Sequence, residues 1–286
     1  MHDQSSSAAI GLAGGALRLG GTARSAVLVP AALAMLLAAL YPLPAAADQR
    51  ADFLAGRTRD CRGCDLAGMN FKRRVLNGAD LSGAILRDAN LHDAQLVGAR
   101  LAGADLTGAN LNKANLGRAD LVGARLRDAM LYAANLDGAT LAGADLTDAL
   151  MGVARLTRSN LANAVLRNVD LRRARLPEAT LIGADLAEAA LDFAFLRAVR
   201  LDGASLRDTR LMGAELINAS LVGADLSGAN ALAASFRGAD LSRARLTGTN
   251  FRRANMHESI LEGAVFQDTV MPDGTVRDAP SAAGAQ

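Results

Sequence analysis

The sequence predicts an all-β fold of the solenoid type, in which short strands stack coil upon coil around a core of Ala and Leu. Three observations support this prediction: a large apolar residue recurs at every fifth position, Ala stands two places before it, and a longer period of 20 residues overlies both. Between residues 66 and 266 the five-residue series has 41 positions, of which 34 are Leu and six are Phe or Met, and 32 of the 41 preceding positions are Ala. Aromatic residues make up only 3% of the chain although 51% of it is hydrophobic, so Ala and Leu must build the core.

A period of five excludes the two simplest structures. Five steps along an α-helix turn through about 500°, so the Leu residues would spiral around it without forming one face. An odd period in a straight strand sends successive Leu side chains to opposite faces. The Ala and Leu of one unit, however, are two residues apart and point the same way. A chain that bends after every unit can therefore keep every Ala and Leu inside.

The 20-residue period sets the number of units in a coil. Gly occupies eight of the ten positions in the series 83, 103 and so on to 263, whereas only nine of the 31 equivalent positions elsewhere are Gly. Four five-residue units therefore close one coil, and Gly is expected at a corner that needs unusual dihedral angles or a close approach of the backbone. The 41 units give about ten coils, each rising by roughly 4.8 Å.

The first 47 residues differ from the rest. A stretch without charge runs from 25 to 47 and ends in Ala45-Ala46-Ala47, which indicates a signal peptide, although a membrane anchor has a similar length. Pro30, Pro42 and Pro44 shorten any helix here and favour cleavage. We therefore expect residues 1–47 to be a signal peptide or membrane anchor. The remainder is expected to be exported, periplasmic or secreted, with an inner-membrane anchored protein as the alternative.

The repeat units resemble a known family. Ala104-Asp105-Leu106-Thr107-Gly108 and Ala224-Asp225-Leu226-Ser227-Gly228 resemble the A(D/N)LXX units of pentapeptide-repeat proteins, and the match runs over about 61–270. This resemblance implies a right-handed quadrilateral β-helix. It also implies a short N-terminal cap over 48–60, which can form a helix, and a C-terminal turn cap over 271–277. Residues 278–286 are expected to be a disordered tail. Met69 and Arg74 depart from the pattern in the first coil, and Ala231 departs from it near the far end.

Two cysteines open the repeat. Cys61 occupies a Leu-type position and Cys64 an Ala-type position, so both are predicted to point inward at the first coil. Two interpretations stay open: the pair fills the end of the core as small hydrophobic residues, or it forms a disulfide on export.

The sequence offers no candidate for catalysis, cofactor binding or metal binding. His92 and His257 both follow an inward residue and lie on different faces about eight coils apart, so they cannot share a metal or activate a nucleophile. We therefore expect no enzymatic activity and no cofactor.

Charged residues alternate along one face. In the series that follows Leu86, Arg stands at 87, 127, 167 and 207, while Asp stands at 105, 145, 185 and 225 in the intervening coils. Stacking is expected to bring each Arg close to an Asp of the next coil and to give a charge-balanced ladder. The interleaved Asp and the scarcity of aromatic residues argue against a stripe that binds nucleic acid.

Apolar residues gather on the neighbouring face, and they define the candidate interaction face. Seven outward positions in the column of Leu131 are apolar, and Phe195 lies just beyond its corner; the eight residues are Met130, Tyr132, Leu150, Val153, Phe193, Phe195, Met212 and Leu232. Clustered exposed apolar residues are typical of interaction surfaces, although an Ala-rich solenoid can also tolerate scattered ones.

The function predicted is that of a non-enzymatic, exported solenoid acting as a rigid scaffold for an unknown protein partner. The molecule is expected to be a monomer or an end-to-end homodimer, and to contact a membrane only if residues 25–47 are retained. The family resemblance suggests one alternative, because some members protect DNA gyrase as acidic mimics of DNA. After removal of residues 1–47, 29 basic and 28 acidic residues remain, a net charge of +1, so both charge and export disfavour that role.

Overall fold

The computed structural model describes residues 49–278. The predicted signal peptide or membrane anchor over 1–47 lies outside these residues, as does all but the first residue of the predicted tail. Within the described range, no helix is both long enough and apolar enough to span a bilayer.

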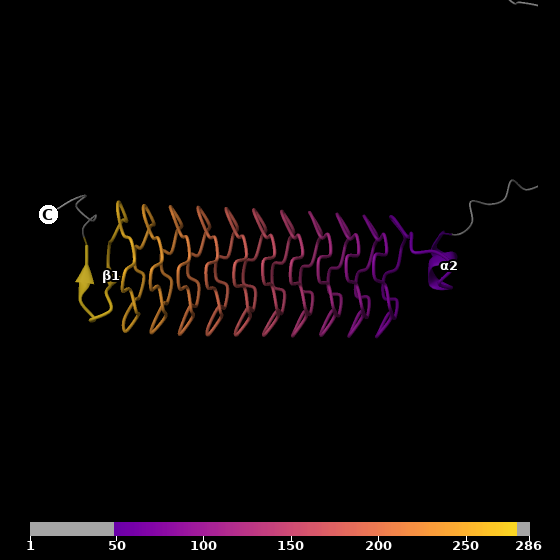
Figure 1. Ribbon diagram of the computed structural model, residues 1–286, viewed down its shortest axis with the longest axis horizontal. Helices are drawn as coiled ribbons and strands as arrows, with labels where there is room; N and C mark the ends of the chain where they lie inside the picture. Colours follow the sequence, from indigo (N-terminus) through magenta and orange to yellow (C-terminus); the bar gives the residue numbers. More distant parts are fainter. Residues whose placement is uncertain (1–48, 279–286) are drawn as a thin grey trace, which may run out of the picture. The chain divides into compact units, whose positions relative to one another are not determined.

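Residues 60–270 form the predicted right-handed quadrilateral β-helix. Every fifth residue from Asp60 to Asn250 pairs in parallel with the residue 20 places further along, so Asp60 pairs with Asp80 and Asn250 with Val270. The register is unbroken, which confirms the coil of four five-residue units. Figure 1 shows the coils stacked between the N-terminal helix and the C-terminal hairpin.

Each unit turns the chain at a tight corner. In the unit that begins at Leu81, the amide of Ala84 donates to the carbonyl of Leu81 at 3.0 Å, and the amide of Gly83 donates to Ala102 of the next coil at 2.9 Å. Gly83, the third residue of the turn, has φ of 64°. A positive φ at this position is the signature of a type II turn.

The glycine column does not mark a special corner. All four corner columns adopt the left-handed conformation, and Asn163 and Arg243 adopt it with φ of 56° and 58° in the glycine column itself. A Cβ added at Gly143 would meet no atom within 4 Å. The expectation that Gly occupies corners with unusual dihedral angles is confirmed, but the other three corner columns have the same dihedral angles, and nothing in the structure explains why Gly gathers in this one.

The Asp or Asn before each inward Leu has a local role that the sequence analysis did not assign. The Asp80 side chain accepts a hydrogen bond from the amide of Ser82 at 3.1 Å, and Asn110 accepts one from the amide of Asn112 at 3.1 Å. This hydrogen bond satisfies an amide that does not donate to the backbone of the neighbouring coil, as in an Asx turn. It gives a physical reason for Asp and Asn in the repeat.

The core consists of the inward Leu and Ala side chains, which are almost all fully buried. Where Ser or Thr replaces the inward Ala, the hydroxyl donates to a carbonyl: Ser159 to Leu156 at 2.7 Å and Thr209 to Leu206 at 2.7 Å. Among the described residues, no buried side-chain polar atom lacks a hydrogen-bond partner. The described interior is thus filled by apolar side chains, and its few polar atoms are hydrogen-bonded within the chain.

Helix α2, Gln49–Leu54, covers the N-terminal end of the core. Phe53 is buried, and its ring meets that of Phe71 edge to face with centroids 6.1 Å apart. Arg74 donates to the carbonyl of Leu54 at 2.6 Å and lies over the Phe71 ring. The departure of Arg74 from the repeat therefore tethers the cap, while the backbone of the first coil keeps its regular pairing.

The C-terminal end is covered by a hairpin. Strand β1, Thr269–Val270, pairs antiparallel with β2, Val276–Arg277. The turn between them is held by Asp273, whose carboxylate accepts hydrogen bonds from the amide and hydroxyl of Thr275. Arg277 lies over the ring of Phe266, with its guanidinium carbon 4.0 Å from the centroid. Both ends of the stack are thereby covered by chain, as a solenoid requires.

Candidate interaction surface

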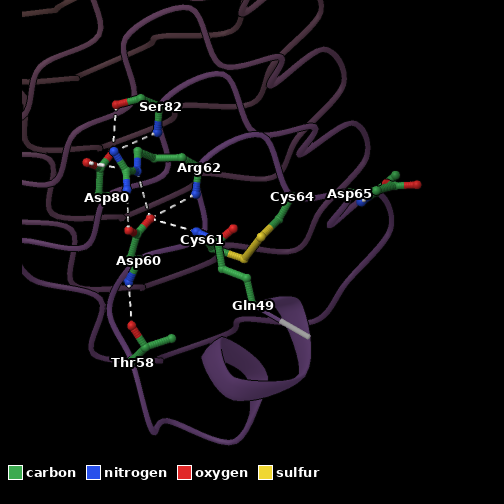
Figure 2. Close-up of a disulfide and its surroundings, with 10 residues drawn as sticks. Gln49, Thr58, Asp60, Cys61, Arg62, Cys64, Asp65, Asp80 and Ser82 are labelled. Atoms are coloured by element: carbon green, nitrogen blue, oxygen red, sulfur yellow. Dashed lines mark hydrogen bonds and ion pairs between the residues drawn. A yellow bond between two sulfur atoms is a disulfide. The ribbon is translucent and has the colours of Figure 1, made fainter. Parts of the chain in front are cut away.

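The structure joins Cys61 and Cys64 in a disulfide, with their Cα atoms 5.2 Å apart (Figure 2). Both residues are buried at the first coil, which lies beside the helix that carries Gln49 (Figure 2). Beside them Asp60 accepts two hydrogen bonds from the Arg62 side chain and one from Gln49 of α2. The disulfide is thus part of the structure that closes the N-terminal end of the core.

The charge ladder has the predicted geometry. Each Arg meets the Asp 18 residues later: Arg87 and Asp105 are 2.6 Å apart, Arg167 and Asp185 are 2.5 Å apart, and two further pairs, Arg127–Asp145 and Arg207–Asp225, lie at 3.6 and 3.9 Å. Burial opposes ionisation of Asp105, but hydrogen bonds from Thr107 and Arg87 outweigh it and hold the pKa of this carboxyl below its usual range. The charges of these four pairs balance one another within the chain, and each pair at this exposure is worth about 0–1 kcal/mol.

The candidate interaction face carries a concavity of about 520 Å³. Two aromatic side chains border it, Tyr132 and Phe193, and they are 54% and 50% exposed. Val153 lies beside the first and Met212 beside the second. All four residues belong to the face whose inward residues include Leu131 and Leu191, so one side of the solenoid supplies the whole concavity.

Each aromatic ring lies against a glycine of the next coil. A Cβ at Gly152 would be 3.4 Å from the Tyr132 ring, and one at Gly213 would be 2.7 Å from the Phe193 ring. Any larger residue at 213 would have to displace the ring, because Cβ contacts below 3 Å do not occur. The glycines therefore allow both rings to lean along the face toward the next coil.

Charged residues line the centre of the concavity. Arg172 donates to both carboxylate oxygens of Asp170, at 2.8 and 2.6 Å, and this pairing holds the pKa of Asp170 below its usual range. Asp192 is only 4% exposed, and it accepts hydrogen bonds from Arg210 at 2.5 Å and from the amide of Met212 at 3.3 Å. Arg173 also lines the concavity, but it makes no ion pair with any described residue.

Only some of the eight residues predicted for the candidate interaction face line the concavity. Tyr132, Val153, Phe193 and Met212 line the concavity. Three others lie on the same face outside it, and Phe195 lies on the neighbouring face, where Arg175 packs 5.6 Å from its ring centroid. The three are Met130, Leu150 and Leu232.

The charged residues of the concavity were missed by sequence reasoning, which on this face considered only the apolar positions. The position of the rings did have a sequence signal: an aromatic residue followed by Gly one coil later, as in Tyr132–Gly152 and Phe193–Gly213, marks where a ring leans over.

Among residues 49–278, no cluster of His, Cys, Asp and Glu could hold a metal ion.

These features define a pentapeptide-repeat solenoid with capped ends and a concavity on the face bordered by Tyr132 and Phe193. The family model "Pentapeptide repeats" matches in successive copies over 60–148, 154–191, 194–230 and 233–271, and the chain therefore belongs to the pentapeptide-repeat family. A comparison with curated proteins finds no match.

Solved structures of the family resemble the chain to different degrees. HetL from the cyanobacterium Nostoc sp. strain PCC 7120, a pentapeptide repeat protein involved in regulation of heterocyst differentiation, is 36% identical, with 80% of this chain and 97% of HetL covered and a TM-score of 0.68. A pentapeptide repeat protein from the Arabidopsis thaliana thylakoid lumen is 37% identical over 39% of this chain and 70% of its own, with a TM-score of 0.24. QnrB1, a plasmid-mediated fluoroquinolone resistance protein, is 18% identical over 70% of this chain and 90% of its own, with a TM-score of 0.44.

Proposed function

We propose that the protein is a non-enzymatic, exported scaffold that binds a protein partner through the face bordered by Tyr132 and Phe193. The observation that carries this proposal is the concavity itself, because two half-exposed aromatic rings flank it on one face of the solenoid. Aromatic side chains supply much of the binding energy of protein interfaces. The coils behind them are cross-linked by backbone hydrogen bonds at every unit, so the surface is rigid and loses little entropy when a partner binds.

The binding proposal is tested by the double variant Tyr132→Asp/Phe193→Asp. Both side chains point outward from intact coils, so we expect an unchanged melting temperature and loss of the associated protein in chemical cross-linking of living cells. Val122→Asp is the matched control, because Val122 is also an exposed apolar residue but lies on the opposite side of the coil. Equal recovery of the cross-linked protein from the double variant and the control would contradict the proposal.

Export is supported by two observations. The uncharged stretch over 25–47 ends in small residues before Asp48, as signal peptides do. The Cys61–Cys64 disulfide is of a kind that persists in oxidising compartments. N-terminal sequencing of the protein from fractionated cells tests this part, with Asp48 as the expected first residue. An uncleaved protein in the cytosolic fraction would refute export, and an uncleaved protein in the membrane fraction would favour the anchored form.

A further inference from the structure

One of the three arginines that line the concavity lacks an acidic partner, and this indicates the charge of the ligand that the concavity would bind. Arg172 and Arg210 are neutralised by Asp170 and Asp192, whereas Arg173 has no acidic partner among the described residues. Its position in the corner, with φ of 58°, is fixed by the backbone hydrogen bond from its amide to Asp192. The backbone thus anchors Arg173 at the edge of the concavity, where its unpaired side chain can reach an anion bound there.

The rest of this face also carries a net positive charge. Between residues 70 and 253 its outward positions hold eight basic and three acidic residues, a net charge of +5, whereas the neighbouring face with the Arg–Asp ladder holds six basic and eleven acidic ones between 65 and 268, a net of −5. The overall charge of +2 thus conceals a segregation between adjacent faces. The basic residues of the concavity face are Lys72, Arg73, Lys113, Arg172, Arg173, Arg210, Arg252 and Arg253, and the acidic ones are Asp93, Asp170 and Asp192.

The backbone of this face cannot bind a partner strand. The amide of Leu171 donates to Ala190 at 2.8 Å, and the amide of Arg173 donates to Asp192 at 3.0 Å, as their equivalents do in the neighbouring coils. A ligand therefore cannot extend a sheet here, as it does at an open edge. A ligand on this face must therefore be recognised by the outward side chains of successive coils.

The spacing of the lining residues sets the pattern of the ligand. Tyr132 and Phe193 are three coils apart, about 14 Å at roughly 4.8 Å per coil, and Arg173 lies between them. An extended chain covers about 13 Å in four residues and turns residues i, i+2 and i+4 to one side. The two apolar ends of the concavity and its central cation thus match three alternate side chains of one extended segment.

We infer that the concavity binds an extended acidic segment of a partner protein with the pattern apolar–x–Asp/Glu–x–apolar. The acidic side chain pairs with Arg173, while one apolar side chain packs against Tyr132 and Val153 and the other against Phe193 and Met212. This inference rests on the proposed function, since it names the chemistry of the partner that the same face binds.

The test uses synthetic peptides and the purified protein. The probe is a fluorescein-labelled peptide with the core Phe-Ser-Glu-Ser-Leu, compared by fluorescence anisotropy with two variants in which Glu becomes Lys or both apolar residues become Ser. We expect the acidic peptide to bind at least about tenfold more tightly than either variant, which corresponds to about 1.4 kcal/mol, and to weaken as salt is raised. Arg173→Glu should abolish this preference. Arg125→Glu should not, because Arg125 is an exposed Arg without an ion pair on the neighbouring face.

Several outcomes would overturn the inference. Equal binding of the Glu and Lys peptides would do so, as would an unchanged affinity in Arg173→Glu or tighter binding of an oligothymidine of matched length. A dimer that forms at micromolar concentration and is lost in Phe193→Asp would place a second copy of the chain in the concavity instead. If the peptides fail while Tyr132→Asp/Phe193→Asp still loses its cross-linked protein in cells, the acidic pattern is wrong and the proposed function stands.

Discussion

Replacing Ala231 by Leu would restore the most common inward residue of the repeat, yet we expect it to destabilise the solenoid. Ala231 is fully buried, and its backbone keeps the regular pairing with the next coil. The residue stacked one coil further, Phe251, and the next residue at a Leu-type position, Phe236, are both fully buried and meet edge to face with centroids 5.3 Å apart. We infer that these two rings fill the volume that Leu provides elsewhere, so that the departure from the repeat is compensated within the core.

For Ala231→Leu, the repeat pattern predicts a gain in folding stability, whereas the structure predicts a loss. If position 231 were underfilled, three added carbons would stabilise the fold by about 2 kcal/mol, at roughly 0.8 kcal/mol per buried methylene. Because the Phe pair already fills the space, we expect overpacking to cost about 1–3 kcal/mol instead. Adding Phe251→Leu to Ala231→Leu should recover most of the loss. Leu171→Ala in the same column should leave a cavity in the core and lower the folding stability by about 3–5 kcal/mol.

Urea unfolding followed by far-UV circular dichroism measures these differences. The slope of the transition must stay constant among the variants, since a solenoid can lose cooperativity and the comparison then fails. A midpoint for Ala231→Leu above that of the unmodified protein would refute the account of the Phe pair.

Three further predictions concern the ladder, the corners and the N-terminal end. Because the pKa of Asp105 is lowered in the folded protein, its stabilising contribution is complete above the ordinary value of 3.8 and is lost as the pH falls below it; Asp105→Asn should therefore flatten the acid side of the stability–pH profile, and an unchanged profile would count against the ladder. Gly143→Ala should cost about 1 kcal/mol although its Cβ would meet no atom, because φ is 65°, and a neutral result in thermal melts would contradict the corner assignment. Alkylation of the purified protein should find no free thiol at Cys61 or Cys64, and reduction should lower the stability of the cap by about 2 kcal/mol, the chain-entropy value for so short a loop; full alkylation without reductant would show that the pair is not oxidised.

Much of the architecture follows from the sequence because the repeat leaves few alternatives. A period of five with Ala and Leu two apart excludes a helix and a straight strand, and the 20-residue period then fixes the register that Asp60–Asp80 pairing shows. The ladder could also be predicted, since coil stacking alone decides that Arg87 meets Asp105.

The details of the site could not be predicted in the same way. Whether Tyr132 stands away from the surface or leans along it depends on the absence of a side chain at Gly152, one coil later. That Arg173 is left without a partner depends on which of several nearby Asp residues each Arg reaches, and rotamers of adjacent coils decide this. Arg74 is another such case, because its departure from the repeat reads as an irregularity until helix α2 is seen to end against it.

The central claim is that one face of the solenoid binds the partner, and site-specific photo-cross-linking in living cells tests it most directly. A photoreactive amino acid replaces Phe193 in one variant and Val122, on the opposite side, in the other. The account predicts a specific cross-linked protein from position 193 that is absent from position 122. Cross-links of equal yield from both positions, or from position 122 alone, would contradict it.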